Sequence, residues 1–361
     1  MIFNRSSSGL PLQAALCCAI TVLPCAALAD DRPDAHAPIG VMADHTHAKG
    51  EVMVSYRLMH MAMGGSRDGT RKISPQEIAT TQPNRFFGVP GQPPSLRVVP
   101  RTMPMDMHMV GVMYAPADWI TLMAMGNYVT KKMTHTTFKG GMGSEVLGSF
   151  KTSAKGFGDT SVSAIFPLRK SHDFELNARM GLSIPTGSSV KTGTVLTPMN
   201  MMPELRLPYA MQLGSGSWDV LPGATIRQTR GAWGWGAQYQ GTIRSGKNDH
   251  GYKFGDSHMA TAWVSRSLAP WISTSLRLSG RTTGKISGID PAIVAPVQTA
   301  DPDNYGGNTI DAHIGANLLA NKGALQGTRL GVEFGMPLLR DLNGPQLETD
   351  WSLTVGLQKT F

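Results

Sequence analysis

The last eleven residues constrain the fold of this chain more than any other stretch. Apolar side chains stand at Trp351, Leu353, Val355 and Leu357, and the chain ends on Phe361. Polar or small residues fill the positions between them, and Lys359 is the one polar residue on the apolar side. Because the side chains of a strand alternate between its two faces, this pattern predicts an amphipathic β-strand.

The same alternation recurs along the chain, for example at 172–185, where Phe174, Leu176 and Ala178 oppose Glu175 and Asn177. Long and short connections also alternate, as expected for a membrane barrel with tight periplasmic turns. A terminal strand that stops on an aromatic residue is typical of such barrels. The sequence therefore predicts an all-β fold, a transmembrane antiparallel β-barrel of about 12 strands with short periplasmic turns and long extracellular loops. Strands are expected at 51–63, 103–115, 118–132, 157–168, 172–185, 215–229, 232–244, 257–269, 271–284, 308–321, 326–338 and 349–361.

Six connections are expected to be long: 64–102, 133–156, 186–214, 245–256, 285–307 and 339–348. An even number of strands places both ends of the barrel on the periplasmic side, in agreement with the terminal Phe361. A soluble sandwich predicts no such alternation of loop lengths.

The first residues resemble an export signal, with Arg5, an apolar stretch and the small residues Ala27 and Ala29 before a cleavage point. We expect 1–29 to be a signal peptide, 30–50 a periplasmic N-terminal segment and 51–361 an outer-membrane β-barrel. The expected location is the outer membrane of a Gram-negative cell. A lipoprotein with a lipidated Cys25 is the alternative, and Pro24 before it argues against that reading.

Composition excludes several classes of function. All three cysteines lie inside the signal, so the mature chain has no thiol for catalysis, disulfides or zinc. No later segment has the roughly 20 apolar residues of a spanning helix. The net charge of +8 is spread along the chain, which does not indicate nucleic-acid binding. The expected partners are outer-membrane lipid, the export and barrel-assembly machinery, and a small solute or metal ion.

Several short strings together resemble a known family. They include Gly156–Thr160, Gly181–Gly187 and Leu213–Gly216, followed by Gly251–Asp256 and Asp341–Pro345. Their order and spacing are similar to those of the outer-membrane β-barrel transporter family labelled "MetA-pathway of phenol degradation". The resemblance covers most of the chain after about residue 105. It implies a barrel and solute passage across the outer membrane, and it implies no catalytic residues and no particular substrate.

Methionines recur at spacing two on three predicted strands, which puts each set on one face. The pattern predicts that these methionines point into the lumen. On the second strand the same register turns Asp106 and His108 outward, unless a bulge resets the register there. Thioethers suit Cu(I) or Ag(I), and imidazoles suit Cu(II), so a copper ion is a candidate ligand; a flexible filling of a narrow barrel is the alternative. No other cofactor is expected. The candidate metal residues are Met59, Met61, Met107, Met109, Met123, Met125, His45, His47 and His60.

Charged side chains are expected on the same inner face. They either line a wet pore that favours anions or pair with one another and plug the barrel. The predicted lumen-lining residues are Arg57, Glu175, Arg179, Arg244, Arg277, Arg281, Arg329 and Glu333.

These patterns predict an outer-membrane channel or transporter for a small solute, with a methionine-lined soft-metal path as a narrower form. The alternatives are a copper-handling barrel and a plugged structural or binding barrel without transport. An enzyme is not expected, because no serine and histidine stand in a recognisable catalytic motif.

Overall fold

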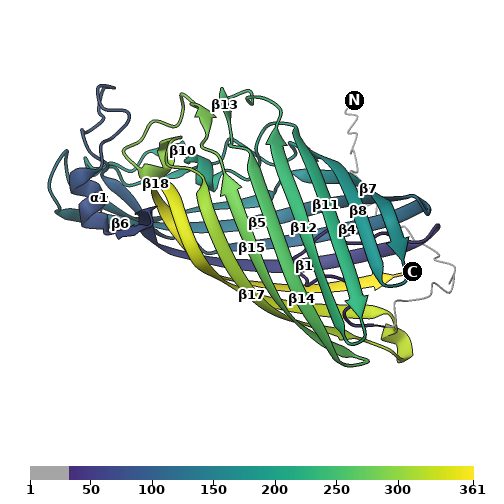
Figure 1. The fold of residues 1–361 in the computed structure, drawn as a ribbon. Helices are drawn as coiled ribbons and strands as arrows, with labels where there is room; N and C mark the ends of the chain where they lie inside the picture. The colour runs from purple at the N-terminus through teal and green to yellow at the C-terminus, as the bar shows by residue number, and fades with distance from the viewer. Residues whose placement is uncertain (1–31) are drawn as a thin grey trace, which may run out of the picture.

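The computed structural model describes residues 32–361, so the predicted signal peptide at 1–29 lies outside the described residues. Nearly all regular structure is β-strand, and the strands form one closed wall (Figure 1). The wall consists of β1 (Val52–Gly69), β4 (Met105–Ala117), β5 (Ile120–Phe138), β6 (Val146–Phe157), β7 (Thr160–Ser171), β8 (Phe174–Ile184), β11 (Asp219–Arg230), β12 (Trp233–Arg244), β14 (Ser257–Ala269), β15 (Ile272–Thr283), β17 (Gly307–Leu319) and β18 (Thr328–Thr360).

Every pair of neighbouring strands in this wall is antiparallel. β6 and β7 pair with successive parts of β5, so together they cross the wall once. β18 crosses twice, because it pairs with β17 as far as Leu342 and with β1 from there to Thr360. The described chain thus makes twelve crossings, which confirms the predicted β-barrel of about 12 strands.

The first and last strands close the ring. Val52 and Phe361 exchange backbone hydrogen bonds of 3.1 and 2.8 Å, and the register runs on through Tyr56 opposite Leu357. Both ends of the barrel therefore lie at one rim, which we call the terminal rim; α1 (Pro75–Thr81) lies at the opposite, loop rim (Figure 1). No helix among residues 32–361 is long and apolar enough to cross a membrane.

The wall sorts its side chains by polarity. On β1, Val54 and Tyr56 are exposed on the outside, whereas Ser55 and Arg57 are buried inside. The next strand repeats this order, with Val110 and Val112 exposed. An apolar outer face around a polar interior is the arrangement that a lipid-embedded barrel requires.

Two connections differ from their predicted form. The region predicted as a long loop at 133–156 is largely a hairpin, because β5 extends to Phe138 and β6 begins at Val146. The connection predicted at 339–348 is strand, since β18 stays paired through its reversal near Leu342. In both places the two paired strands continue beyond the barrel wall as a hairpin, and the turn residues form only the tip of that hairpin.

Loops fold over the loop rim and close it with apolar side chains. Short strands there are β2 (Arg71–Ile73), β3 (Val98–Thr102), β9 (Thr192–Thr194), β10 (Glu204–Arg206), β13 (Tyr252–Lys253) and β16 (Ser287–Gly288), with 3-10 turns at Tyr209–Met211 and Gln298–Ala300. A third 3-10 turn, Gly323–Leu325, joins β17 to β18 at the terminal rim. Phe86, Tyr209, Tyr252 and Ile293 form one buried cluster. The fully buried guanidinium of Arg97 donates to five backbone carbonyl groups of these loops.

Three of the strings that suggested a family meet in space. The Asp159 carboxylate accepts hydrogen bonds from the backbone N–H of Gly187 (3.0 Å) and of Ser215 (2.7 Å). Gly187 and Gly214 pack backbone against backbone, where a side chain on either would collide. The strings therefore join the N-terminal end of β7 to the loop between β8 and β11. This close packing explains their glycines.

We expect Gly214→Ala to destabilise the barrel by about 1–3 kcal/mol, because the new methyl group would lie 2.4 Å from the carbonyl oxygen of Gly187. The midpoint of urea unfolding of the protein folded in detergent measures this. Gly246→Ala is the matched control, since a methyl group there meets nothing within 4 Å. Equal midpoints for the two variants would show that the contact between the two glycines contributes no stability.

Candidate functional site

Residues 32–50 are called the plug here; 32–47 lie inside the ring, and 48–50 are exposed at the terminal rim before β1 begins. Ala35, Ala37, Ile39, Val41 and Ala43 are all at least 95% buried. Ala37 and Val41 pack on Trp263 of β14, and Ala43 packs on methionines of β1 and β4. The segment that the sequence assigned to the periplasmic side thus occupies the lumen near the terminal rim.

Polar contacts attach the plug to many strands of the wall. The Glu175 carboxylate on β8 accepts hydrogen bonds from Thr46 N–H (3.0 Å) and from its hydroxyl (2.8 Å). Gln238 on β12 donates to the Met42 carbonyl at 2.8 Å. Further bonds join Thr121 on β5 to His47 N–H (3.0 Å), Ser267 on β14 to Asp34 (2.7 Å) and Arg329 on β18 to the Ala37 carbonyl (2.6 Å).

Glycines let the plug approach the wall closely. A methyl group at Gly40 would lie 2.2 Å from Glu333 Oε1, so the plug backbone crosses directly over that side chain. On the wall, a methyl group at Gly331 or Gly356 would collide with Ile39. The fit is therefore specific on both sides of the contact.

Four of the predicted lumen residues take part in buried ion pairs. Arg277 binds Glu333 through two nitrogen atoms (3.0 and 2.5 Å). Arg227 binds Glu175 at 2.7 Å, and Arg244 binds Asp219. Glu175 and Glu333 also touch the plug, so these acidic groups support both the wall and the segment inside it.

Of the other predicted lumen arginines, Arg57, Arg179 and Arg281 have no carboxylate oxygen within 4 Å among residues 32–361. Arg57 is 5% exposed, Arg179 donates to the Ser163 hydroxyl (3.1 Å), and Arg281 contacts the Met259 sulfur (3.3 Å). Arg329 donates to Gln358 (3.0 Å) and to plug carbonyls. The inner wall therefore carries positive charge that its carboxylates do not pair.

The predicted methionine wall is continuous in the structure. Met59 stands opposite Met107, Met61 opposite Met105, and Met113 opposite Met123. One cluster near the plug contains Met53, Met113, Met123 and Met125. A second, nearer the loop rim, contains Met103, Met133 and Met211, with Met63, Met105 and Met107 against it. Met109, which is 7% exposed, faces Arg57 and Asn127 on the neighbouring strands.

No bulge resets the second strand between Met105 and Tyr114, so Asp106 and His108 point outward. Both are satisfied there, since Asp106 pairs with His60 (2.6 Å) and His108 with the Tyr56 hydroxyl (2.7 Å). The structure therefore separates His60 from Met59 and Met61, which face the lumen. The cause is the period of two: a residue between two inward methionines must point outward.

The two other candidate histidines lie in the plug, close to each other. The ring centroids of His45 and His47 are 4.8 Å apart, and His36 lies 4.1 Å from His45. Asp44 bonds His45 Nδ1 at 2.9 Å. Burial lowers the pKa of His36 well below its usual value and that of His47 to about 3. Burial opposes ionisation of Asp44, yet its contacts with His45 lower the pKa of the carboxyl well below the usual range.

His36 and Asp44 were not among the predicted metal residues. The only signal for them was their proximity in sequence to His45 and His47, and a nine-residue separation gave no periodicity that would place His36 beside His45.

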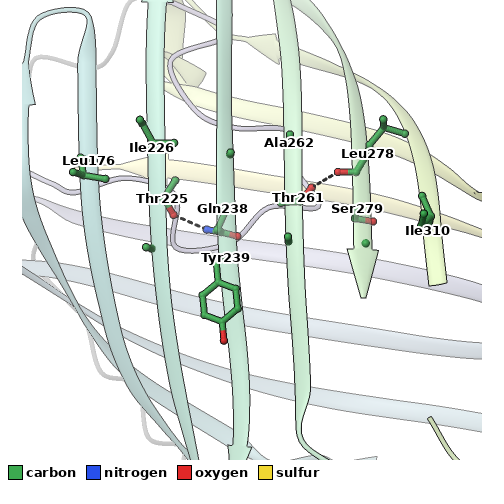
Figure 2. Close-up of a pocket in the computed structure, with 14 residues that line it drawn as sticks. Leu176, Thr225, Ile226, Gln238, Tyr239, Thr261, Ala262, Leu278, Ser279 and Ile310 are labelled. Carbon is green, nitrogen blue, oxygen red and sulfur yellow. Dashed lines mark hydrogen bonds between the residues drawn. The ribbon is translucent and has the colours of Figure 1, made fainter. Parts of the chain in front are cut away.

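Two hollows mark the surface. One, of about 680 Å³, opens at the terminal rim and is lined by plug residues including His36, His45 and His47. The other, of about 560 Å³, is a shallow depression on the wall of β11, β12, β14 and β15 (Figure 2). Its lining combines small residues such as Ala262 with the larger Tyr239, Leu278 and Ile310, which are exposed on the outer face. The hollow at the terminal rim is the one that reaches the plug.

Comparison with solved structures agrees with this fold. An outer membrane channel from Pseudomonas putida F1 is similar over 89% of this chain and 99% of its own, with 17% identity and a TM-score of 0.56. A mutant of the monoaromatic hydrocarbon channel TodX covers 87% of this chain and 91% of its own (9% identity, TM-score 0.45). The translocator domain of the autotransporter NalP from Neisseria meningitidis covers 89% and 91% (10% identity, TM-score 0.43).

No family model matches the sequence, and no curated protein is significantly similar to it. The family label suggested by the short strings therefore stays a prediction. The first of these solved structures shows that the chain has the fold of an outer-membrane channel barrel.

We expect Glu175→Ala to loosen the plug by about 2–4 kcal/mol, because it leaves Thr46 and the half-buried Arg227 without their carboxylate. Residues 32–361 contain no cysteine, so the maleimide labelling rate of a single Ala37→Cys reporter in a protein without 1–29 measures exposure of the plug. The rate should rise at least 10-fold. Glu145→Ala, which removes an exposed ion pair with Lys139, is the control. An unchanged rate in Glu175→Ala would show that this carboxylate does not hold the plug.

Proposed function

We propose that this protein is an outer-membrane channel for a small solute, and that the plug closes its pore in the conformation described. The observation that carries the proposal is the polar attachment of a non-barrel segment inside a polar lumen. The wall groups that bind the plug, such as Gln238 and Thr121, are also groups that water can satisfy. Release of the plug therefore exchanges its hydrogen bonds with the wall for hydrogen bonds with water, and the pairing of the barrel strands stays intact.

The similar solved structure supports the same class of function, since it is described as an outer membrane channel. The apolar outer face, with Val54, Tyr56 and Val110 exposed, supports location in the outer membrane. Export through the signal at 1–29 is part of this proposal. That the protein is not an enzyme is also part of this proposal. Ser279 Oγ lies 3.0 Å from His313 Nε2 in the lumen, but the similar solved structure is described as a channel.

The solute is proposed to be anionic or polar. Arg57, Arg179 and Arg281 face the lumen with no carboxylate within 4 Å among residues 32–361, and cationic groups that line a narrow pore favour anions. The apolar cluster of Phe86 and Tyr209 at the loop rim is a second barrier, which has to part for passage.

The methionine wall supports a second candidate function, a path for a soft metal ion. Methionines face each other across β1, β4 and β5 from Met113 and Met123 to Met103 and Met133. Thioethers bind Cu(I) and Ag(I) in preference to harder ions. In this reading the protein is a copper-handling barrel, and the wall provides successive weak ligands along the pore axis.

Deletion of residues 32–49 should increase conductance, because it removes the plug from the lumen, leaves β1 and its pairing with β18 intact, and leaves the apolar cluster at the loop rim as the barrier that still has to part. Single-channel recording in a planar bilayer measures this: we expect steps at least several-fold larger than in the undeleted mature protein, with a reversal potential that indicates anion preference. Retention of a heat-modifiable band on gels checks that the variant folds. If neither form conducts, the protein is a binding or structural barrel.

The soft-metal path is tested in the same recordings with Ag⁺. Block by micromolar Ag⁺ that is lost in a Met59→Leu, Met107→Leu, Met123→Leu triple variant is expected, because leucine keeps the volume and removes the sulfur. Leucine at the exposed Met142 and Met199 is the control. Open steps indifferent to Ag⁺ would reduce the methionine wall to packing.

A further inference from the structure

Three potential ligand atoms of the plug converge near the terminal rim. His36, Asp44 and His45 each offer one atom, and these atoms all lie within 4.8 Å of one another. The Nδ1 atoms of the two histidines are 3.1 Å apart, and His45 Nδ1 is 2.9 Å from Asp44 Oδ1. We infer that this cluster, here called the plug triad, is a binding site for a divalent transition-metal ion of the kind that imidazole prefers, such as Cu²⁺ or Zn²⁺.

The contacts within the plug triad carry the inference. A neutral imidazole has one N–H, and a carboxylate only accepts hydrogen bonds. If His45 Nδ1–H donates to Asp44, that single proton must also serve the contact with His36 Nδ1. An ion at the centre resolves this, because two imidazole nitrogens and a carboxylate oxygen then all donate lone pairs to it.

A second, independent observation lies beside the triad. His45 Nε2 and His47 Nε2 are buried and have no hydrogen-bond partner among residues 32–361. The two side chains are only 6% and 5% exposed. Buried polar atoms are normally paired, and leaving one unpaired costs about 1–3 kcal/mol. These are the ring nitrogens opposite the Nδ1 atoms that contact Asp44 and Glu51, so they mark unsatisfied imidazole beside the triad and are not themselves ligands of an ion at its centre.

The surroundings hold the triad in place. The second oxygen of Asp44 accepts a hydrogen bond from Ala37 N–H at 2.8 Å, which closes the segment from 37 to 44 on itself. Arg329 donates to the carbonyl groups of His36 (3.3 Å) and Ala37 (2.6 Å). Groups that orient the ligands in this way strengthen a metal site. The ion has access through the hollow at the terminal rim, which His36 and His45 line.

The local charge argues for selectivity. Arg227 and Arg329 lie near the triad, and the carboxylates of Glu175 and Glu51 bond Thr46 and His47, the residues that follow His45. With charges of both signs around it, the site gains little from simple attraction of a cation. Ions that bind oxygen by charge alone, such as Ca²⁺, are therefore disfavoured relative to those that accept nitrogen lone pairs.

Metal binding would stabilise the docked plug, because the ligands come together only when the segment is folded in the lumen. The gain follows the ratio of free ion to its dissociation constant. This inference goes beyond the proposed channel function, since the site exists in the plug whether or not the barrel conducts.

Isothermal titration calorimetry of the full mature protein with Cu²⁺ and with Zn²⁺, after treatment with a chelator, tests the inference. We expect one ion per chain, no comparable binding of Ca²⁺, and at least a roughly 10-fold loss of affinity in His36→Gln and in His45→Gln. His172→Gln is the matched control, because that side chain is 98% exposed. The electron paramagnetic resonance spectrum of bound Cu²⁺ should show coupling to at least two nitrogens.

Unchanged stoichiometric binding in the His36→Gln, His45→Gln double variant would overturn the inference and move the ion to another site, as would the absence of binding by the unaltered protein. His36 lies beside the hollow, so His36→Gln alone decides if His45→Gln does not fold. None of these readouts depends on conductance, so a barrel that never conducts leaves the result for the metal site standing.

Discussion

The hydrogen-bonded pairing of β1 with the last part of β18 is the contact on which the rest of the structure depends. It joins residues as far apart as Val52 and Phe361 and leaves the barrel no free edge. In a bilayer an unpaired strand edge is too costly to persist, so closure is a requirement. Once the ring is closed, the period of two assigns every strand residue to one of two solvents, lipid or lumen. The methionine wall, the inner arginines and the outward His60 all follow from that single assignment.

How much the sequence could predict follows from the same rule. The strands, their number and the inward direction of Met59, Met107 and Met123 were predictable, because each depends on a local alternation. The same alternation places His60 on the outer face, because it lies between Met59 and Met61, which point inward. Grouping His60 with the inward methionines therefore conflicted with the period of two. Continued strand through Leu342 was missed because Asn343, Gly344 and Pro345 resemble a loop, although the pairing persists on both sides of them.

The contacts of the plug lay beyond prediction. Apolar residues recur at spacing two from Ala35 to Ala43, but this alternation does not identify the partners of the plug, which lie far along the chain. Thr46 bonds Glu175, Asp34 bonds Ser267, and Ala37 bonds Arg329. The charged inner residues left two readings open, a wet pore or a paired and plugged interior. The structure contains elements of both, since Arg277 and Glu333 pair, while Arg57 has no acidic partner among the described residues.

Different interactions close the two rims of the barrel, and this difference affects how each rim opens. At the loop rim, Phe86, Tyr209 and Tyr252 bury apolar surface, so opening there exposes it to water and is resisted by the hydrophobic effect. At the terminal rim, the plug combines apolar packing on Trp263 and the methionines with hydrogen bonds to groups such as Glu175 and Gln238, which water can replace at a modest net cost for each bond. A ligand that binds only the docked plug adds its binding free energy to this closure. The plug triad stands at that rim, so an ion bound there shifts the population toward the closed state.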